Sequence, residues 1–452
     1  MTGSTTQRRW QILIGATLAA TLIAGAGVVT QRADAEAGEH DPVVRKSASE
    51  MTPAEIDRFE RAFSYAVGKG YLDDFNDEHN DHMRNRQHGA DLLSTAPPAA
   101  VPGETPAYGF RLLPWHRAFI IEAEQMLRAA LRQRDHAEGR DPGEAEKLFI
   151  PYWDATHEQD LPGWVRAFQP RGGTAIVPEG VPPGHAAFGL PVGSRYHIRF
   201  GRWPGNNIVF DRLPQPAQVS QILAHEDFVS FYASIDVGVQ IIQSAVPAAR
   251  RGIATLERKV PNNTDVKILA SALEPDYQQN PADPLAVFNA VLGVGYLATT
   301  EAARPHPDQE LIGAVKAVYA AILFPPHIVL HLWAGGLKPD NPDVRGTVTN
   351  FNELAVDPAF WMLHAELDRW WYTWEQSHTG VPPLAGDDAL FRPLTPIEGA
   401  WYGGGRQYSL SELTDTPSLP YRYGELYADR THQHLIPALP PIPALPLRRA
   451  VR

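Results

Sequence analysis

The stretch DPAFWMLHAELDRWW, residues 357–371, decides the fold of this chain. Asp357 followed by Pro358 is typical of the beginning of a helix, because an Asp side chain caps free backbone N–H groups and proline fits the first turn. Apolar residues follow at helical spacing. We therefore predict a helix that begins at Pro358 and runs to about Ser377.

His364 lies in the middle of this predicted helix, among phenylalanine and tryptophan residues. A histidine on so apolar a face is most often a core residue with its own hydrogen-bond partners. Asp368 lies one turn further along the same face, where its carboxylate could accept the second ring N–H of a metal-bound imidazole. The pair therefore favours a metal-ligand role for His364.

Two further histidines lie in PPHIVLHLWAGG, residues 325–336. The two prolines break the chain before a short helix from His327 to Trp333, and the two glycines end it. His327 and His331 are four residues apart, so their side chains share one helix face and can converge on one ion. A glutamate does not follow His327, and the zinc-protease pattern H-E-x-x-H is therefore absent from this stretch.

The N-terminal half of the chain supplies a second group of histidines. The capping box Thr52-Pro53-Ala54-Glu55 predicts an amphipathic helix over residues 53–69, and Pro114-Trp115-His116 opens another helix. His79 and His88 lie upstream of His116 in polar, loop-like stretches, where surface histidines are common. His79 and His88 indicate a metal site only as part of the whole pattern, in which two regions of the chain each offer about three histidines.

The composition limits which ions such a pattern could hold. The 452 residues include 17 histidines and no cysteine, which excludes disulfides, iron–sulfur clusters and thiolate ligands. Imidazole-only sites suit copper or zinc, and two three-histidine sites would suit a copper pair that shares dioxygen. The net charge of −12 argues against nucleic-acid binding.

Helices dominate the predicted organisation, so the fold class is mainly α with long irregular loops and a few short strands. Further helices are expected over residues 218–235 and 309–324, whereas residues 158–217 are rich in proline and glycine, with a strand-like piece at 196–200. Residues 431–452 form a proline-rich tail.

The first 35 residues have the layout of an export signal. Arg8 and Arg9 precede the uncharged stretch from Ile12 to Val29, and Ala33-Asp34-Ala35 offers a cleavage site. The adjacent arginines are similar to the twin-arginine signal, which carries folded proteins. We expect cleavage and export to the periplasm or the extracellular space, with no stable membrane insertion afterwards; the alternative is a single N-terminal anchor.

Taken together, these residues resemble the tyrosinase family, the type 3 copper proteins that include tyrosinases, catechol oxidases and o-aminophenol oxidases. The motifs that carry the resemblance span residues 44–427. In chain order they are Val44-Arg45-Lys46, Met51 to Glu55, Gly70 to Phe75 leading to His79, Leu113 to Phe119, Pro151 to Asp154, His327 to His331 with Gly335-Gly336, Asp357 to His364 with Asp368, and Tyr421-Arg422-Tyr423.

The resemblance implies a four-helix bundle core around a dinuclear copper site, with two copper ions as the cofactor. Matched residue by residue, the first copper would be held by His79, His88 and His116, and the second by His327, His331 and His364. The family usually places its middle ligand about nine residues before His116, where Ala107 stands here. Residues 89–110 are therefore interpreted as an insertion, and His82 competes with His88.

Three departures from the family pattern bear on activity. Leu363 stands where many members have a second, non-ligating histidine, and Ile328 where hydroxylating members often carry asparagine. Val318 and Tyr319 stand where such members place a water-holding glutamate. A base for monophenols is thus not visible, which favours o-diphenols or o-aminophenols, although packing explains Leu363 equally well. Hydroxylation of monophenols, the monooxygenase activity, is left open.

The function implied is a copper-dependent polyphenol oxidase that turns o-diphenols or o-aminophenols into o-quinones or quinone imines with dioxygen. The catalytic domain would span residues 36–430, with an insertion at about 236–308, and a separate accessory protein could load the copper. A copper-binding or dioxygen-carrying protein with little catalysis is the alternative. A zinc hydrolase is a weaker alternative, since the sequence shows no convincing general-base carboxylate next to the histidine ligands.

Overall fold

The computed structural model confirms that helices dominate the chain. It describes residues 42–84, 112–177, 187–206, 213–236, 240–241, 243–274, 290–291, 293–295, 297–298, 301–302, 304–323, 325–339, 341–350, 353–379, 390–391 and 408–427. The helices are α1 (Pro53–Lys69), α2 (Tyr71–Arg84), α3 (Leu112–Ala137), α4 (Gly163–Ala167), α5 (Pro216–Leu223), α6 (Phe228–Asp236), α7 (Val246–Lys259), α8 (Thr264–Ala272), α10 (Gln309–Tyr319), α11 (Pro326–Gly335), α12 (Pro358–Ser377) and α13 (Leu410–Thr414). The strands are β1 (Val43–Arg45), β2 (Thr174–Ile176), β3 (Arg195–His197), β4 (Gln240–Ile241), β5 (Ile322–Leu323), β6 (Leu337–Lys338), β7 (Asn341–Arg345), β8 (Leu390–Phe391), β9 (Tyr408–Ser409) and β10 (Tyr421–Tyr423).

Local signals set the ends of the predicted helices. The Thr52 hydroxyl accepts the backbone N–H of Glu55, whose side chain accepts the N–H of Thr52, so α1 begins with the predicted capping box. Gly70 ends α1 in the left-handed conformation with φ of 75°. At α12, Asp357 accepts the N–H of Ala359 at 2.9 Å. Both helices have the bounds expected from the sequence.

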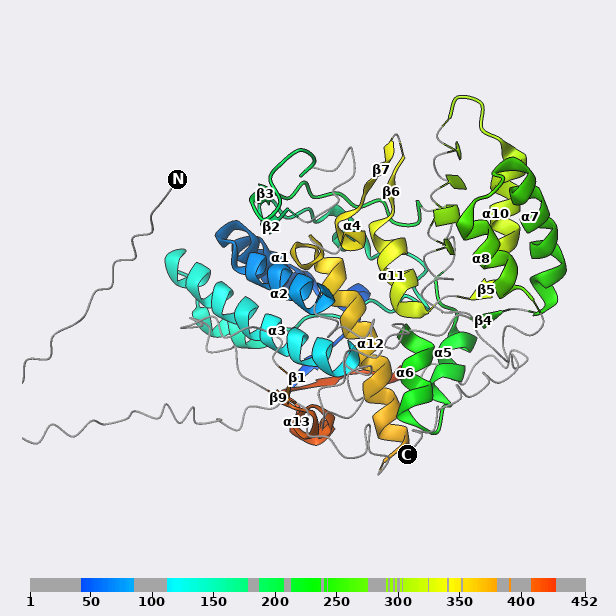
Figure 1. Cartoon of the computed structure of the whole chain (residues 1–452). Coiled ribbons are helices and arrows are strands. Elements are labelled where there is room, and N and C mark those ends of the chain that lie inside the picture. Colours follow the sequence, from blue (N-terminus) through cyan, green and yellow to red (C-terminus); the bar gives the residue numbers. More distant parts are fainter. Residues whose placement is uncertain are drawn as a thin grey trace, which may run out of the picture. The chain divides into compact units, whose positions relative to one another are not determined.

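Four helices form the core that carries the histidines. Phe75 of α2, Phe119 of α3 and Trp361 of α12 contact one another, with ring centroids 4.9 to 5.5 Å apart. Helix α11 packs against α12, and α12 also packs along α3 (Figure 1). Because these aromatic side chains are fully buried, burial of apolar surface holds α2, α3 and α12 together, and Leu330 of α11 belongs to the same hydrophobic core. The mainly α fold with a four-helix core is confirmed.

Two expected helices are wrong in extent. The segment expected as one helix over 218–235 is divided into α5 and α6, because Asp227 accepts the N–H of Ser230 and begins a new helix. The helix expected over 309–324 ends at Tyr319. The next residues turn into β5, since a chain that approaches Pro325 and Pro326 is disfavoured in the helical conformation.

A buried ion cluster joins both ends of the described chain to α12. Strand β1 pairs in parallel with β10, which places Arg45 beside Tyr423. Asp368 of α12 accepts hydrogen bonds from Arg45 at 3.3 Å and Arg117 at 2.6 Å, and from the hydroxyls of Tyr421 and Tyr423 at 2.6 Å each. These partners hold the pKa of Asp368 below its usual value against the effect of burial.

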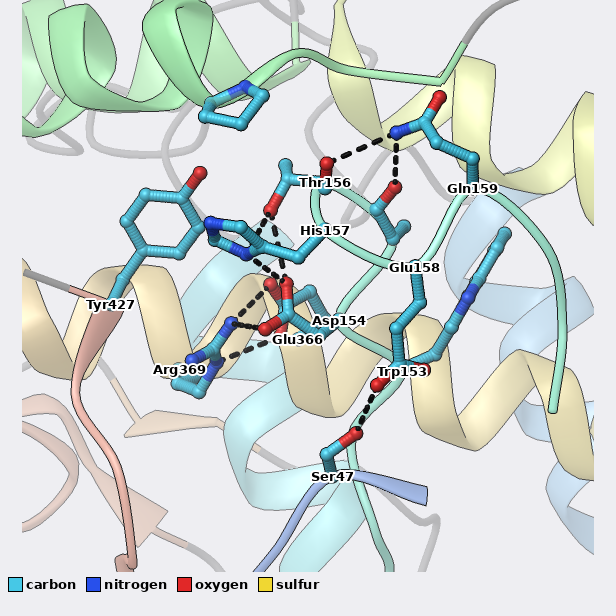
Figure 2. A network of polar contacts seen from close by, with 12 residues as sticks. Ser47, Trp153, Asp154, Thr156, His157, Glu158, Gln159, Glu366, Arg369 and Tyr427 are labelled. Carbon is cyan, nitrogen blue, oxygen red and sulfur yellow. Dashed lines mark hydrogen bonds and ion pairs between the residues drawn. The ribbon is translucent and has the colours of Figure 1, made fainter. Parts of the chain in front are cut away.

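A second polar network fixes the other side of α12 (Figure 2). Arg369 forms two hydrogen bonds of 2.8 Å with Glu366 and an ion pair of 3.4 Å with Asp154. Asp154 also contacts the Nδ1 atom of His157 at 2.8 Å. Despite its burial, these partners lower the pKa of Asp154 to about 2. The network ties the segment after α3 to the helix that carries His364.

The long segment before α11 has a hydrophobic core of its own. Helices α7, α8 and α10 lie side by side in Figure 1, in green to yellow. Their buried side chains, among them Leu256, Leu269 and Val315, form a hydrophobic cluster of their own, separate from the main core. The antiparallel pair β4–β5 joins the two ends of this segment. Of the described residues within the insertion expected at about 236–308, those of α7 and α8 belong to this small helical layer.

None of the helices described is both long and apolar enough to cross a membrane. The predicted signal at residues 1–35 and the proline-rich tail at 431–452 lie outside the described residues.

Candidate metal centre

Four core helices bring five of the predicted ligands together. Helix α2 carries His79, α3 carries His116, α11 carries His327 and His331, and α12 carries His364. Each of the five residues is at most 4% exposed. Five buried imidazoles at one place are unusual, since buried polar groups require partners. The arrangement therefore points to a shared ion or ions.

Three of these histidines form a site compact enough for one metal ion. One ring nitrogen from each of His327, His331 and His364 lies within 4.8 Å of the other two. The ring centroids are 4.9 to 5.2 Å apart. The predicted i, i+4 pair thus converges with the histidine of the next helix, as the sequence indicates.

The outer nitrogens of the α11 pair are held by protein acceptors. The Nδ1 atom of His331 donates to the carbonyl oxygen of Val348 at 2.9 Å, and the Nδ1 atom of His327 lies 2.9 Å from a carboxylate oxygen of Asp236. In a neutral imidazole the other nitrogen, Nε2, then carries a lone pair. The two Nε2 atoms are 3.1 Å apart, so two lone pairs face each other unless a cation binds them.

His364 is held in the same way. Its Nδ1 atom donates to the carbonyl oxygen of Phe360 at 2.9 Å, and its buried Nε2 atom has no hydrogen-bond partner among the described residues. The expectation that Asp368 would accept its ring N–H is wrong. Asp368 is occupied by Arg45 and Arg117, because helix α12 turns that carboxylate toward the ion cluster.

The first group of histidines adjoins the second. The His116 ring stacks on the His364 ring at 3.9 Å between centroids and 13° between planes. His79 lies 5.8 Å from His116, also between ring centroids. The Nδ1 atom of His116 donates to the carbonyl oxygen of Leu112 at 2.8 Å. Rings from both halves of the chain therefore meet at one place.

Burial keeps the imidazoles of His331 and His364 neutral. Burial, and then the neighbouring His327 ring, lowers the pKa of His331 to about 3. Burial and the rings of His331 and His327 also lower the pKa of His364 well below its ordinary value. A neutral imidazole is the form that binds a metal ion. The donor set thus fits copper or zinc by its chemistry.

The sequence interpreted His79 as loop-like, and this is wrong. His79 lies on α2, where it is buried against Trp115 and Phe360. His82 lies on the same helix, whereas His88 falls outside the described residues together with the insertion at 89–110. The choice between His82 and His88 as the middle ligand stays a prediction.

Three of the four residues at which the sequence departs from the family pattern pack in hydrophobic surroundings. Leu363 is fully buried in the main core, and Val318 and Tyr319 belong to the cluster of α7, α8 and α10. Asp357 caps α12 and pairs with Arg202 at 2.6 Å. Its contacts in the described part of the chain are therefore those of a helix cap and a buried ion pair.

Sequence reasoning missed Asp236, the carboxylate that contacts His327. The two residues are 91 positions apart in the chain, and Asp236 carries no motif. In the sequence, Asp236 is only the first residue of the insertion expected at about 236–308. No signal in the sequence indicates this contact, because it depends on how α6 packs against α11.

The family model described as the common central domain of tyrosinase matches residues 73–377, more than half of the chain. The chain belongs to the tyrosinase family. Tyrosinase-family proteins bind two copper ions, so the cofactor of this chain is a copper pair and the protein is of the type 3 copper class. The neutral imidazole donors described above fit that cofactor.

Relatives of the tyrosinase family align with this chain over short stretches. A G-type hemocyanin of Enteroctopus dofleini is 31% identical over 75 residues, which is 16% of this chain and 2% of the hemocyanin. The chloroplastic (+)-larreatricin hydroxylase of Larrea tridentata is 40% identical over 71 residues, 16% of this chain and 10% of the hydroxylase. The chain thus matches only a small share of these relatives' length.

Solved tyrosinase structures are similar over most of the chain. A copper-bound mutant of active tyrosinase from Aspergillus oryzae, complexed with L-tyrosine, is 15% identical with a TM-score of 0.37, and the match covers 86% of this chain and 94% of that one. A mutant pro-tyrosinase of Aspergillus oryzae is 16% identical with a TM-score of 0.34, covering 85% and 70%.

Proposed function

We propose that this protein is a copper-dependent oxidase of o-diphenols or o-aminophenols. Two substrate molecules would each lose two electrons and two protons and leave as o-quinones or quinone imines, while one dioxygen is reduced to two water molecules. The observation that carries the proposal is the stacking of His116 on His364 at 3.9 Å, because it joins the two histidine groups into one centre. The proposed ligands are His79, His88 and His116 for the first copper, and His327, His331 and His364 for the second.

When bound, the copper pair would supply dioxygen binding and electron transfer. The chain's own residues hold the ligands in place. Acceptors at Leu112, Val348 and Phe360 fix the Nδ1–H form of three imidazoles, which leaves each Nε2 atom for the metal. Trp115 and Phe360 contact the histidine rings and are at most 1% exposed, so they exclude water from one side of the site.

The residues around the site support diphenols and aminophenols rather than monophenols. Val318 and Tyr319 stand where hydroxylating members place a carboxylate, and both pack in the separate hydrophobic cluster. Asp236, the carboxylate that contacts a proposed ligand, is already bonded to His327 and Tyr232. A substrate that loses its protons readily at a metal does not need such a base.

The experiment is oxygen uptake by the copper-loaded protein with catechol, 2-aminophenol and a monophenol. We expect turnover of the first two and slow or absent turnover of the monophenol. Reversible oxygen binding without consumption of catechol would instead favour an oxygen carrier, the alternative to which the short hemocyanin match lends support. A copper-loaded protein that consumes no oxygen with any of the three would contradict the proposal.

We further propose export by the twin-arginine route, cleavage after about residue 35 and a catalytic domain over residues 36–430. Arg8 and Arg9 support the route, since twin-arginine export carries proteins that have already folded. N-terminal sequencing of the protein secreted by the native host checks the cleavage site. A mature protein that keeps Arg8 and Arg9 would contradict cleavage.

A further inference from the structure

Asp236 lies at an electrostatically unfavourable position, and its contact with His327 compensates for this. It is the last residue of α6, and a carboxylate at a helix C-terminus meets the negative end of the helix dipole. Its side chain is only 10% exposed, and one carboxylate oxygen lies 2.9 Å from the Nδ1 atom of His327. The ring N–H thus supplies the hydrogen bond that the carboxylate needs there.

The second oxygen of Asp236 is held by Tyr232, one turn earlier in α6. The Tyr232 hydroxyl donates to Asp236 at 3.3 Å and accepts the backbone N–H of Leu112 at 3.2 Å. The carbonyl oxygen of the same Leu112 accepts the Nδ1–H of His116 at 2.8 Å. Four hydrogen bonds therefore connect His327 of the second histidine group to His116 of the first.

We propose that Asp236 and Tyr232 are positioning residues that connect the two copper sites. Asp236 fixes His327 with Nδ1 protonated, so that Nε2 faces the metal. Tyr232, fully buried, fixes Asp236 to the first turn of α3, which carries His116. We call this chain of contacts the Asp236–Tyr232 bridge. It requires only that His116 and His327 bind copper, and it holds for an oxidase and for an oxygen carrier alike.

The pairing of β4 with β5 helps to give the bridge its geometry. Strand β4 begins shortly after Asp236, and β5 ends shortly before His327. The pairing of Gln240 with Leu323 and Ile241 with Ile322 therefore brings these two distant parts of the chain together. Helix α6 also packs directly against α11. The β4–β5 pairing and the packing of α6 on α11 thus hold the carboxylate of Asp236 beside His327.

The test measures copper affinity, so it does not depend on the substrate. The full-length variants Asp236→Ala, Asp236→Asn and Tyr232→Phe are titrated with copper against a competing chelator, and thermal unfolding of each metal-free variant checks folding. Asp236→Ala should lower the affinity for one of the two copper ions 10- to 100-fold. This is the usual effect of removing the hydrogen-bond acceptor that orients a metal-binding histidine. Asp236→Asn should weaken it less, because an amide oxygen still accepts the ring N–H. Tyr232→Phe should weaken binding several-fold.

The matched control is Tyr196→Phe. Tyr196 is also buried and donates to a buried carboxylate, that of Glu353, at 2.6 Å. The Tyr196→Phe variant should bind both copper ions as tightly as the wild type. Unchanged affinity in folded Asp236→Ala would overturn the inference, and if that variant does not fold, unchanged affinity in Asp236→Asn would do so. A His327→Ala variant that still bound two copper ions would contradict the ligand assignment itself.

Discussion

The Nε2 atoms of His327 and His331 lie 3.1 Å apart while the Nδ1 atom of each ring contacts an oxygen acceptor. Two neutral rings in this orientation present lone pairs to each other, which is unfavourable in a buried site without a cation. A metal ion removes this repulsion by accepting both lone pairs. The α11 pair is therefore arranged to present both Nε2 atoms to one cation.

Removal of one ligand should therefore abolish binding at one site only. We expect His331→Ala and His364→Ala each to lose one copper per chain and to lose oxidase turnover, because each leaves two imidazoles where three are required. Metal analysis of the purified variants measures this. His136→Ala is the control, since His136 is exposed on the same helix as His116. Full copper and full turnover in either ligand variant would refute the assignment.

Copper should stabilise a protein that is already folded. The main core is closed by buried aromatic and aliphatic side chains, so a metal-free chain keeps its helices. Binding to the folded state alone adds about 2.7 kcal/mol when free copper is a hundred times its Kd. Circular dichroism should show unchanged helix content after chelation, and the Tm should rise with copper concentration. A Tm independent of copper would contradict a preformed site.

Asp368 should be essential for stability although it contacts none of the proposed ligands. Its carboxylate compensates Arg45 and Arg117, which are both fully buried. Asp368→Asn removes the carboxylate that both guanidinium groups share and leaves Arg45 only with Glu124 and Arg117 only with Glu375. We expect a loss of about 3 kcal/mol in unfolding free energy, because the buried charges are then only partly compensated. Asp57→Asn removes an exposed pair with Arg61 and should cost at most about 1 kcal/mol. Equal denaturation midpoints for the two variants would contradict the role of the cluster.

Glu353 should make stability depend on pH near neutrality. Burial raises its pKa from 4.5 to about 7, against the hydrogen bond from Tyr196. The folded state binds the Glu353 proton more tightly than the unfolded state does. The contribution of this proton to the free energy of unfolding is therefore complete below pH 4.5 and is lost as the pH rises to 7, by about 3 kcal/mol at most.

Glu353→Gln imitates the protonated side chain, so its Tm should match the wild type at pH 5 and exceed it at pH 8. Differential scanning calorimetry at the two pH values measures this. The control Glu146→Gln changes the same charge at an exposed position and should shift neither Tm. A constant difference between wild type and Glu353→Gln at both pH values would exclude the titration.

Local signals in the sequence were sufficient for several elements. The capping box at Thr52 and the cap at Asp357 determine where α1 and α12 begin, since capping involves only neighbouring residues. Errors in helix extent came from local signals: Asp227 begins a new helix, and Pro325-Pro326 disfavour helix in the residues before them, where β5 forms instead. The error at Asp368 came from tertiary contacts, because its carboxylate binds arginines from distant segments rather than His364.

The sequence by itself determined the donor chemistry: no cysteine, two groups of histidines, and an i, i+4 pair that any helix places on one face. It also determined the family, through motifs that are local and specific. Only the tertiary structure decided which atoms hold those histidines. The Asp236–Tyr232 bridge joins α6, α11 and the start of α3, and contacts between side chains so far apart in sequence arise from packing, which no local pattern records.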